Sequence, residues 1–147
     1  MFDRTIGKYL GIAGRAYSTI IDKKLCKYKI THGLVPLLIY LYNKEGVNQD
    51  TLCKNYNVNK AVVSKGIVKL ENAGYVMKKV SLNDRRNKLI YLTKKAQDFK
   101  PVFEQIIKEI EDEVKQGIPK QELDTFFSVV QSLCLNLGIN IKSINWT

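Results

Sequence analysis

The stretch at residues 59–93, NKAVVSKGIVKLENAGYVMKKVSLNDRRNKLIYLT, carries the pattern that decides the fold. Asn59 is a common helix-capping residue and Gly74 is a common helix stop. Between them, apolar residues recur at helical spacing at Val63, Ile67 and Leu70. Residues 75–81 and 88–92 then form two β-type runs that flank a polar turn. The stretch therefore predicts a helix followed by an antiparallel hairpin.

Positive charge is concentrated in the same part of the chain. Residues 54–100 hold twelve Lys/Arg and three acidic residues, so nine charges of the formal net charge of +10 lie in about a third of the 147 residues. Residues 101–147 hold four basic and seven acidic residues. Because Lys and Arg bind duplex phosphates by releasing condensed counterions, this asymmetry favours a nucleic-acid partner.

Upstream of residue 59, the spacing of apolar residues predicts three helices. The first is long and covers residues 6–25. The second runs from a cap at Thr31 to Gly46, with Pro36 in its first turns, and the third is short and capped by Asn48. With the helix after Asn59, the third forms a predicted helix-turn-helix, whose second helix enters the major groove N-terminus first.

Downstream, Thr93 is predicted to cap a helix that ends near Gly117, with a kink near Phe99 caused by Pro101. A last helix follows Pro119. The apolar stripes of the first helix and of these last two are too long for the small middle domain to cover. We favour a second copy of the chain as the covering partner over a monomeric six-helix bundle.

Residues early in the helix after residue 58 that face away from its apolar stripe are candidates for contacting base edges. They are Asn59, Lys60, Ala61, Val62, Ser64 and Lys65. Asn pairs with adenine, Lys with guanine, and small apolar side chains with the thymine methyl. For Asn59, a role as a helix cap alone is an equally weighted alternative. Three flanking residues are assigned to phosphate contacts, namely Gln49, Lys54 and Lys69.

The turn of the predicted hairpin is strongly cationic. Arg85 and Arg86 lie at its tip, and lysines lie on its sides at Lys78, Lys79 and Lys88. A narrow minor groove has an enhanced negative potential that attracts such arginines. We expect Asp84 to hold the guanidinium of Arg86 by a bidentate hydrogen bond and to aim it. The alternative is an exposed ion pair that contributes less than about 1 kcal/mol to stability.

Other functional classes find little support in the composition. The cysteines, Cys26, Cys53 and Cys134, form no CxxC pair, and His32 is the only histidine, so we expect no metal site, no cofactor and no enzyme. No apolar run approaches the roughly 20 residues that span a bilayer. The N-terminus lacks a secretory pattern, and we expect a cytoplasmic protein.

Several motifs in this order resemble the MarR family of winged helix-turn-helix regulators, over nearly the whole chain. They are Ile21-Asp22-Lys23-Lys24-Leu25, Ile30-Thr31, Gly46-Val47-Asn48-Gln49-Asp50-Thr51-Leu52, Val63-Ser64-Lys65, Leu70-Glu71-Asn72-Ala73-Gly74-Tyr75-Val76, Asp84-Arg85-Arg86 and Leu92-Thr93-Lys94-Lys95-Ala96. The resemblance implies a mainly α fold with a small β-hairpin wing (α+β). In it, a winged helix-turn-helix at residues 31–93 is flanked by N- and C-terminal dimerisation helices at residues 1–30 and 94–147.

The resemblance also implies a homodimer that binds a pseudo-palindromic duplex as a repressor or, less often, an activator. Arg86 then corresponds to the wing arginine in the groove, Asp84 to its orienting partner, and Lys65 to a recognition-helix position that is often arginine. Small anionic or phenolic effectors release DNA in many members of the family. Here Arg15, Tyr17, His32 and Tyr40 are the candidate polar residues of the effector cleft.

Three alternatives stay open at this level. One is a thiol-based redox response through Cys26, whose neighbouring lysines favour the thiolate. The second is a non-specific architectural nucleic-acid binder that uses charge alone. The third is a winged helix whose basic face binds an acidic protein. The predicted recognition face favours a sequence-specific regulator over the second, and the Asp84/Arg86 arrangement favours either DNA-binding hypothesis over the third.

Overall fold

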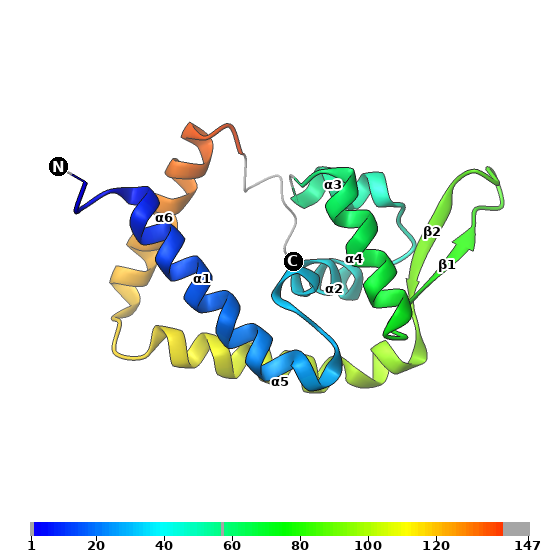
Figure 1. Cartoon of the computed structure of the whole chain (residues 1–147), viewed down its shortest axis with the longest axis horizontal. Coiled ribbons are helices and arrows are strands. Elements are labelled where there is room, and N and C mark those ends of the chain that lie inside the picture. Colours follow the sequence, from blue (N-terminus) through cyan, green and yellow to red (C-terminus); the bar gives the residue numbers. More distant parts are fainter. Residues whose placement is uncertain (1, 57, 140–147) are drawn as a thin grey trace.

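The computed structural model describes residues 2–56 and 58–139 (Figure 1). In chain order its helices and strands are α1 (Ile6–Leu25), the 3-10 turns η1 (Cys26–Tyr28) and η2 (His32–Leu34), α2 (Val35–Asn43), α3 (Gln49–Tyr56), α4 (Lys60–Asn72), β1 (Val76–Val80), β2 (Lys88–Leu92), α5 (Lys94–Lys115) and α6 (Lys120–Asn136). The predicted class, mainly helical with one hairpin, is confirmed. In Figure 1, α2, α3, α4 and the hairpin gather at one end, and α1 and α6 lie at the other. The long α5 runs between the two ends.

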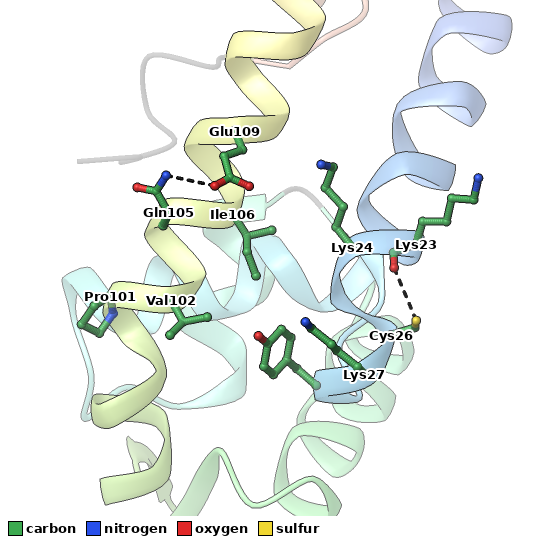
Figure 2. Close-up of a pocket in the computed structure, with 10 residues that line it drawn as sticks. Lys23, Lys24, Cys26, Lys27, Pro101, Val102, Gln105, Ile106 and Glu109 are labelled. Carbon is green, nitrogen blue, oxygen red and sulfur yellow. Dashed lines mark hydrogen bonds between the residues drawn. The ribbon is translucent and has the colours of Figure 1, made fainter.

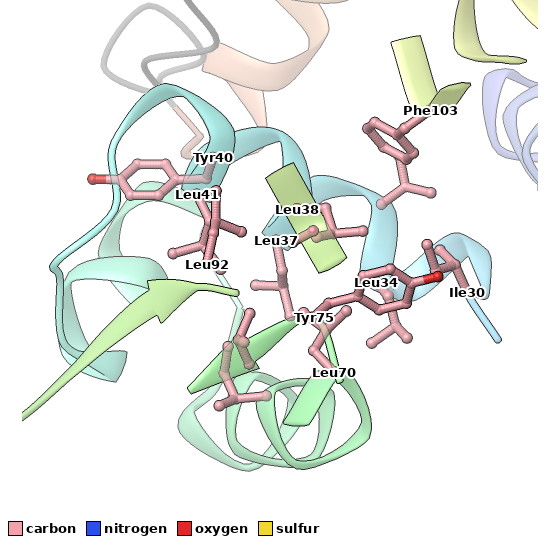
Figure 3. Close-up of a cluster of buried hydrophobic side chains, with 14 of the residues drawn as sticks. Ile30, Leu34, Leu37, Leu38, Tyr40, Leu41, Leu70, Tyr75, Leu92 and Phe103 are labelled. Atoms are coloured by element: carbon pink, nitrogen blue, oxygen red, sulfur yellow. The ribbon is translucent and has the colours of Figure 1, made fainter. Parts of the chain in front are cut away.

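The main core lies where α2 crosses α4 and the hairpin. Leu37, Leu38 and Leu41 of α2 are buried, as are Leu70 of α4 and Leu92 of β2 (Figure 3). Aromatic rings extend this core onto α5, through the pairs Tyr75–Phe99 and Phe99–Phe103, with centroids 5.4 and 5.9 Å apart. Burial of this apolar surface is the main force that holds the helix-turn-helix and the hairpin against α5.

Three of the four helix caps predicted from the sequence are confirmed. The side-chain oxygens of Asn48, Asn59 and Thr93 accept hydrogen bonds from backbone N–H groups three residues on, at 2.9, 2.9 and 3.2 Å. Gly74 ends α4 with a φ of +84°, a conformation that glycine adopts at no steric cost. The limits of α3, α4 and α5 therefore follow from local sequence.

The prediction of a side-chain cap at Thr31 is wrong. The chain enters α2 through η2, and the side chain of Thr31 makes no capping hydrogen bond. The carboxylate of Asp22, on α1, accepts instead from the backbone N–H of His32 at 2.7 Å. A cap supplied by another helix leaves no signal in the local sequence. Pro36 lies in the first turn of α2, as predicted.

The hairpin is antiparallel, with Val76 opposite Leu92 and Val80 opposite Lys88. An isolated bridge between Val47 and Ile90 ties β2 to the segment before α3. This bridge fixes the hairpin to the helix-turn-helix at its base, which leaves the turn at residues 81–87 projecting from the body (Figure 1).

The long helices are only partly covered. Pro101 lies inside α5, which is assigned as one helix from Lys94 to Lys115. Ile21 and Leu25 are the buried residues of α1, and α6 has no buried residue within the part of the chain that the structure describes. In that same part, no helix is long and apolar enough to cross a bilayer.

Candidate nucleic-acid interface

The two sides of α4 differ sharply. Val63, Gly66, Ile67 and Leu70 are buried against the core. On the opposite side, the exposed residues are Lys60, Ala61, Val62 and Lys65, and Ser64 is half-buried. The structure therefore presents most of the predicted base-contacting residues together on one solvated face at the start of the helix. Val68 is also exposed, one turn beyond Lys65, and the sequence analysis did not name it.

Asn59 has a clear structural role. Its Oδ1 accepts from the N–H of Val62, so this oxygen serves as the N-cap of α4. Of the predicted phosphate contacts, Lys54 at the end of α3 and Lys69 on α4 are exposed, and Gln49 at the start of α3 is half-buried.

The predicted role of Asp84 in holding the Arg86 guanidinium needs correction. Asp84 Oδ1 accepts from the backbone N–H of Arg86 at 2.9 Å, and its backbone carbonyl accepts from the N–H of Asn87 at 3.0 Å. Among the residues described, no ion pair joins Asp84 to Arg85 or Arg86. An aspartate that bonds its own backbone two residues on shapes a turn. Asp84 therefore positions the backbone of the tip, where both arginines are exposed.

The lysines of the hairpin have distinct surroundings. The ammonium of Lys79 lies 4.9 Å from the centroid of the Tyr91 ring, which anchors its stem on the strand surface. Lys78 is half-buried, and its Nζ lies 3.5 Å from the carboxylate of Glu71 on α4. Lys88 is exposed at the start of β2.

A small notch lies between the helix-turn-helix and the hairpin. It encloses about 210 Å³ and is bordered by the start of α3, the start of α4 and one side of the hairpin, from Ile90 up to the turn residue Arg86. It brings together four residues predicted to contact DNA, Gln49, Lys60, Arg86 and Lys88. Lys78, which the sequence analysis placed on the side of the cationic hairpin, borders it as well. So do Asn48 and Asn87, which the sequence analysis had not assigned to a binding site.

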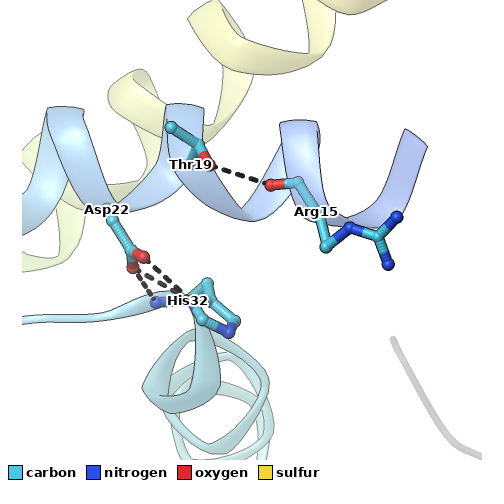
Figure 4. Close-up of polar contacts among 4 residues, drawn as sticks. All are labelled: Arg15, Thr19, Asp22 and His32. Carbon is cyan, nitrogen blue, oxygen red and sulfur yellow. Dashed lines mark hydrogen bonds and ion pairs between the residues drawn. The ribbon is translucent and has the colours of Figure 1, made fainter. Parts of the chain in front are cut away.

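The four residues predicted for an effector cleft do not converge. Asp22 and His32 form a pair with Oδ2 and Nδ1 3.0 Å apart, and the guanidinium of Arg15 points away from this pair (Figure 4). Tyr17 donates to Glu111 of α5 at 2.6 Å, and Tyr40 is buried on α2, where it accepts from Asn55. None of the four borders the cavity between α1 and α5, the one between α2 and α5 or the notch beside the hairpin.

Two carboxylates near the helix junctions have displaced pKa values. The hydrogen bond from the His32 backbone N–H, followed by that from its ring, holds the pKa of Asp22 below the usual range. Burial alone would raise the pKa of Glu111, but hydrogen bonds from Tyr17 and Lys115 lower it. Burial, and then the bond to Glu111, raises the pKa of Tyr17. Both carboxylates are thus charged at neutral pH and join α1 to η2 and to α5.

A larger cavity of about 630 Å³ lies between the end of α1 with η1 and the facing side of α5. Figure 2 shows Lys24 and Lys27 extending toward α5, where Val102 and Ile106 face them. Cys26 borders the same cavity, and its exposed thiol donates to the Lys23 carbonyl at 3.4 Å. The cavity has lysines on its α1 wall, and on its α5 wall the apolar Val102 and Ile106 lie beside the polar Gln105 and Glu109. The Nζ of Lys24 also lies 3.7 Å from the carboxylate of Glu113 on α5.

Comparison with known proteins agrees with this geometry. Residues 30–88 match the sequence model of the MarR family. The regulator BilQ of Clostridium symbiosum, named an HTH-type transcriptional regulator, is 22% identical over 131 residues, which cover 89% of this chain and 91% of that protein.

Solved structures extend the likeness to the whole fold. A MarR transcriptional regulator from Methanosarcina mazei superposes with a TM-score of 0.79 at 27% identity, over 90% of this chain and 97% of its own. A Listeria monocytogenes protein described as a MarR-family transcriptional regulator, and solved in complex with a 26-mer DNA, has a TM-score of 0.79 at 21% identity, over 97% of this chain and 92% of its own. The arginine-tipped hairpin, the solvated recognition face and these relatives together indicate a DNA-binding transcriptional regulator that carries a MarR-family domain at residues 30–88.

Proposed function

We propose that the chain acts as a homodimer that binds a pseudo-palindromic duplex and represses transcription until a small molecule releases it. The observation that carries this proposal is that one chain exposes two surfaces that each favour binding to a partner. One is the cationic face formed by the start of α4 and the hairpin tip, and the other is the uncovered apolar surface of α1 and α6. The cationic face favours binding to a polyanion, and the uncovered apolar surface favours packing against another apolar surface.

The apolar surface supports dimerisation through residues 1–30 and 94–147, with residues 31–93 as the DNA-binding unit. Large apolar side chains are exposed on both sides of this region, at Phe2, Ile6, Tyr9, Leu10, Ile12, Val114, Ile118, Phe126, Phe127, Val129, Leu135 and Leu137. Apolar surface of this extent marks an interaction site. Two copies related by a two-fold axis would cover it with the same surface and would present two recognition helices to the two halves of a palindrome.

Dimerisation is tested by sedimentation equilibrium at micromolar concentrations. Phe127, 47% exposed on α6, is replaced by glutamate, and Gln121→Glu at the start of the same helix adds the same charge as the control. We expect a dimer for the wild type and the control, and a shift toward monomer for Phe127→Glu. A wild type that stays monomeric would refute the proposed assembly.

Specific DNA binding is tested with a duplex selected by the protein from a random pool and with a scrambled version of it. We expect at least about 10³-fold tighter binding to the selected duplex, since specific binding usually exceeds non-specific binding by that factor. The Arg86→Ala variant should bind more weakly and should lower the salt slope by about one. Equal affinity for both duplexes would favour the architectural binder.

The recognition face makes a separate prediction. Lys65→Ala and Ser64→Ala should change the base preference by about 1–3 kcal/mol at one position per half-site. A uniform loss over all sequences would reassign these side chains to phosphate.

The 630 Å³ cavity is our candidate effector site, because Val102 and Ile106 favour an apolar body and Lys24 and Lys27 favour an anion. An anion bound there would compete with Glu113, which lies 3.7 Å from Lys24, and would have to lie away from Glu109. Tyr28 borders it, and its backbone carbonyl accepts from the hydroxyl of Tyr75, at the end of the recognition helix, at 2.8 Å. A bound molecule would thus contact a segment bonded to the winged domain.

The effector site is tested with a panel of small aromatic acids, with benzoate as the reference probe. A ligand at about 100 times its Kd should stabilise the protein by roughly 2.7 kcal/mol and should release labelled DNA. The stabilisation should vanish in a Lys24→Met, Lys27→Met variant. Stabilisation that persists in this variant would place the ligand elsewhere.

A further inference from the structure

The notch between α3, α4 and the hairpin has an unusual concentration of positive charge. Lys60 from α4, Lys78 from β1, and Arg86 and Lys88 from the end of the hairpin border a space of about 210 Å³. Asp50 is the carboxylate among the bordering residues, and Glu71 lies 3.5 Å from Lys78 on the side of α4. Four cations around so small a space repel one another, so a bound anion would relieve that repulsion.

A hydrogen bond between two asparagine side chains, which we call the amide clip, holds the two walls of the notch together. The Nδ2 of Asn48 donates to the Oδ1 of Asn87 at 3.1 Å. Asn48 is itself fixed, because its Oδ1 accepts from both the N–H and the hydroxyl of Thr51 at 2.9 Å. On the hairpin side, the carbonyl of Asn87 accepts from the N–H of Ser81 at 2.8 Å. The clip therefore joins the residue before α3 to the end of the hairpin turn and sets the width of the notch.

The position of the notch identifies its occupant. A recognition helix in the major groove and a wing in the adjacent minor groove lie on opposite sides of one sugar–phosphate strand. Whatever separates α4 from the hairpin in the complex must therefore be that strand. The notch opens between these two elements, and a single phosphate, with its oxygens as acceptors, matches a lining of ammonium, guanidinium and amide donors.

We propose that the notch seats one backbone phosphate of duplex DNA in each protomer. Lys60 then contacts phosphate rather than a base edge, and Lys78 and Lys88 complete the seat. Asn48 and Asn87 are positioning residues that hold the wing at the distance of one strand from α4. This inference rests on the proposed DNA binding, and it reassigns Lys60 from the recognition face to a phosphate seat that also draws on Lys78, Asn48 and Asn87.

The test replaces single phosphates of the selected duplex by neutral methylphosphonates, one position at a time. For the wild type, one position per half-site, between the bases contacted by α4 and those contacted by the wing, should weaken binding about tenfold. Lys60→Ala should lose about the same factor on unmodified DNA and lower the salt slope by about one. On the duplex modified at that position, the variant and the wild type should bind alike.

Two further variants separate the proposed contact from a structural effect. Lys60→Arg keeps the charge and should retain the methylphosphonate penalty at the same position. Lys120→Ala removes a lysine at the exposed start of α6 and should leave the whole profile unchanged. Asn87→Ala breaks the amide clip but leaves every charge in place, so the penalty should spread over neighbouring phosphates.

Two outcomes would overturn the proposal. In one, Lys60→Ala keeps the full methylphosphonate penalty at every position. In the other, the Lys60→Ala variant changes the preferred base at one position and leaves the salt slope unchanged. That result would mean that Lys60 contacts a base edge and not a phosphate. Failure of the proposed function would look different, because the wild type would then not distinguish the selected duplex from the scrambled one.

Discussion

Gly66 lies on the buried side of the recognition helix, and its replacement by alanine tests how closely α4 packs on α2. A methyl group at this position would lie 2.6 Å from Leu37 Cδ1 and 3.5 Å from Leu34 Cδ2. Carbon atoms in contact prefer about 3.5–4.0 Å, so the first approach is too short by about 1 Å. Leu37 is only 5% exposed and cannot move without displacing its own neighbours.

Two effects of opposite sign decide the outcome of Gly66→Ala. Alanine favours the helix over glycine by about 1 kcal/mol. Overpacking a filled core costs about 1–3 kcal/mol. We therefore expect a net destabilisation of about 0–2 kcal/mol, at about 2–4 °C of melting temperature per kcal/mol. Because α4 must shift to admit the methyl group, specific DNA binding should weaken as well.

A double-mutant cycle with Leu37→Ala isolates the contact. Leu37→Ala alone should cost about 2–5 kcal/mol because it leaves a cavity. In the double variant the new methyl group occupies part of that cavity, and the two changes should couple favourably by about 1–2 kcal/mol, within the range for residues in contact. Urea unfolding is measured at a fixed protein concentration, since a dimer's stability depends on it. Additivity within about 0.5 kcal/mol would refute the packing argument.

Three further predictions concern single hydrogen bonds. Asn59→Ala should lower stability by about 1 kcal/mol through loss of the α4 cap, whereas Asn59→Asp should retain it, as thermal unfolding would report. Tyr75→Phe removes the bond to the Tyr28 carbonyl and should cost about 1–3 kcal/mol; no change in the urea midpoint would contradict that bond. The lowered pKa of Asp22 means that its carboxylate, paired with His32, stabilises the fold above the ordinary carboxyl pKa, and that this contribution disappears as the pH falls through the folded pKa. The stability difference between the wild type and Asp22→Asn, less than about 1 kcal/mol for so exposed a pair, should therefore be fully present at pH 6 and should decrease as the pH falls below the ordinary carboxyl pKa in paired denaturation series.

The fold was largely predictable because its elements are defined by local chemistry. The caps at Asn48, Asn59 and Thr93 mark helix starts through bonds that span three residues. The hairpin of Val76–Val80 and Lys88–Leu92 follows from two β-type runs and a polar turn. The predicted cap at Thr31 was wrong for a physical reason. The backbone N–H of His32, at the start of η2, donates to Asp22, which lies ten residues earlier on another helix.

The site was predictable to the extent that it lies on one helix face. Helical spacing places Lys60, Ala61 and Lys65 on the exposed side of α4 without reference to the rest of the molecule. The notch depends instead on Asn48 and Asn87, which are 39 residues apart and meet only when the hairpin docks. Neither residue has a local pattern that distinguishes it from an ordinary turn or cap asparagine.

Bonds between distant segments also determine where the recognition helix lies. The end of α4 is held by the start of α5: Lys95 donates to the Ala73 carbonyl, and the Thr93 hydroxyl donates to the Gly74 carbonyl, each at 2.6 Å. The same lysine lies 4.6 Å from the centroid of the Tyr75 ring, whose hydroxyl bonds to η1. A displacement of α5 relative to α1 must therefore either carry α4 with it or break these bonds. In the proposed assembly, the helices that we assign to dimerisation would thus set the angle at which α4 meets DNA, and a molecule bound between α1 and α5 would change the affinity for DNA without contacting the DNA-binding face.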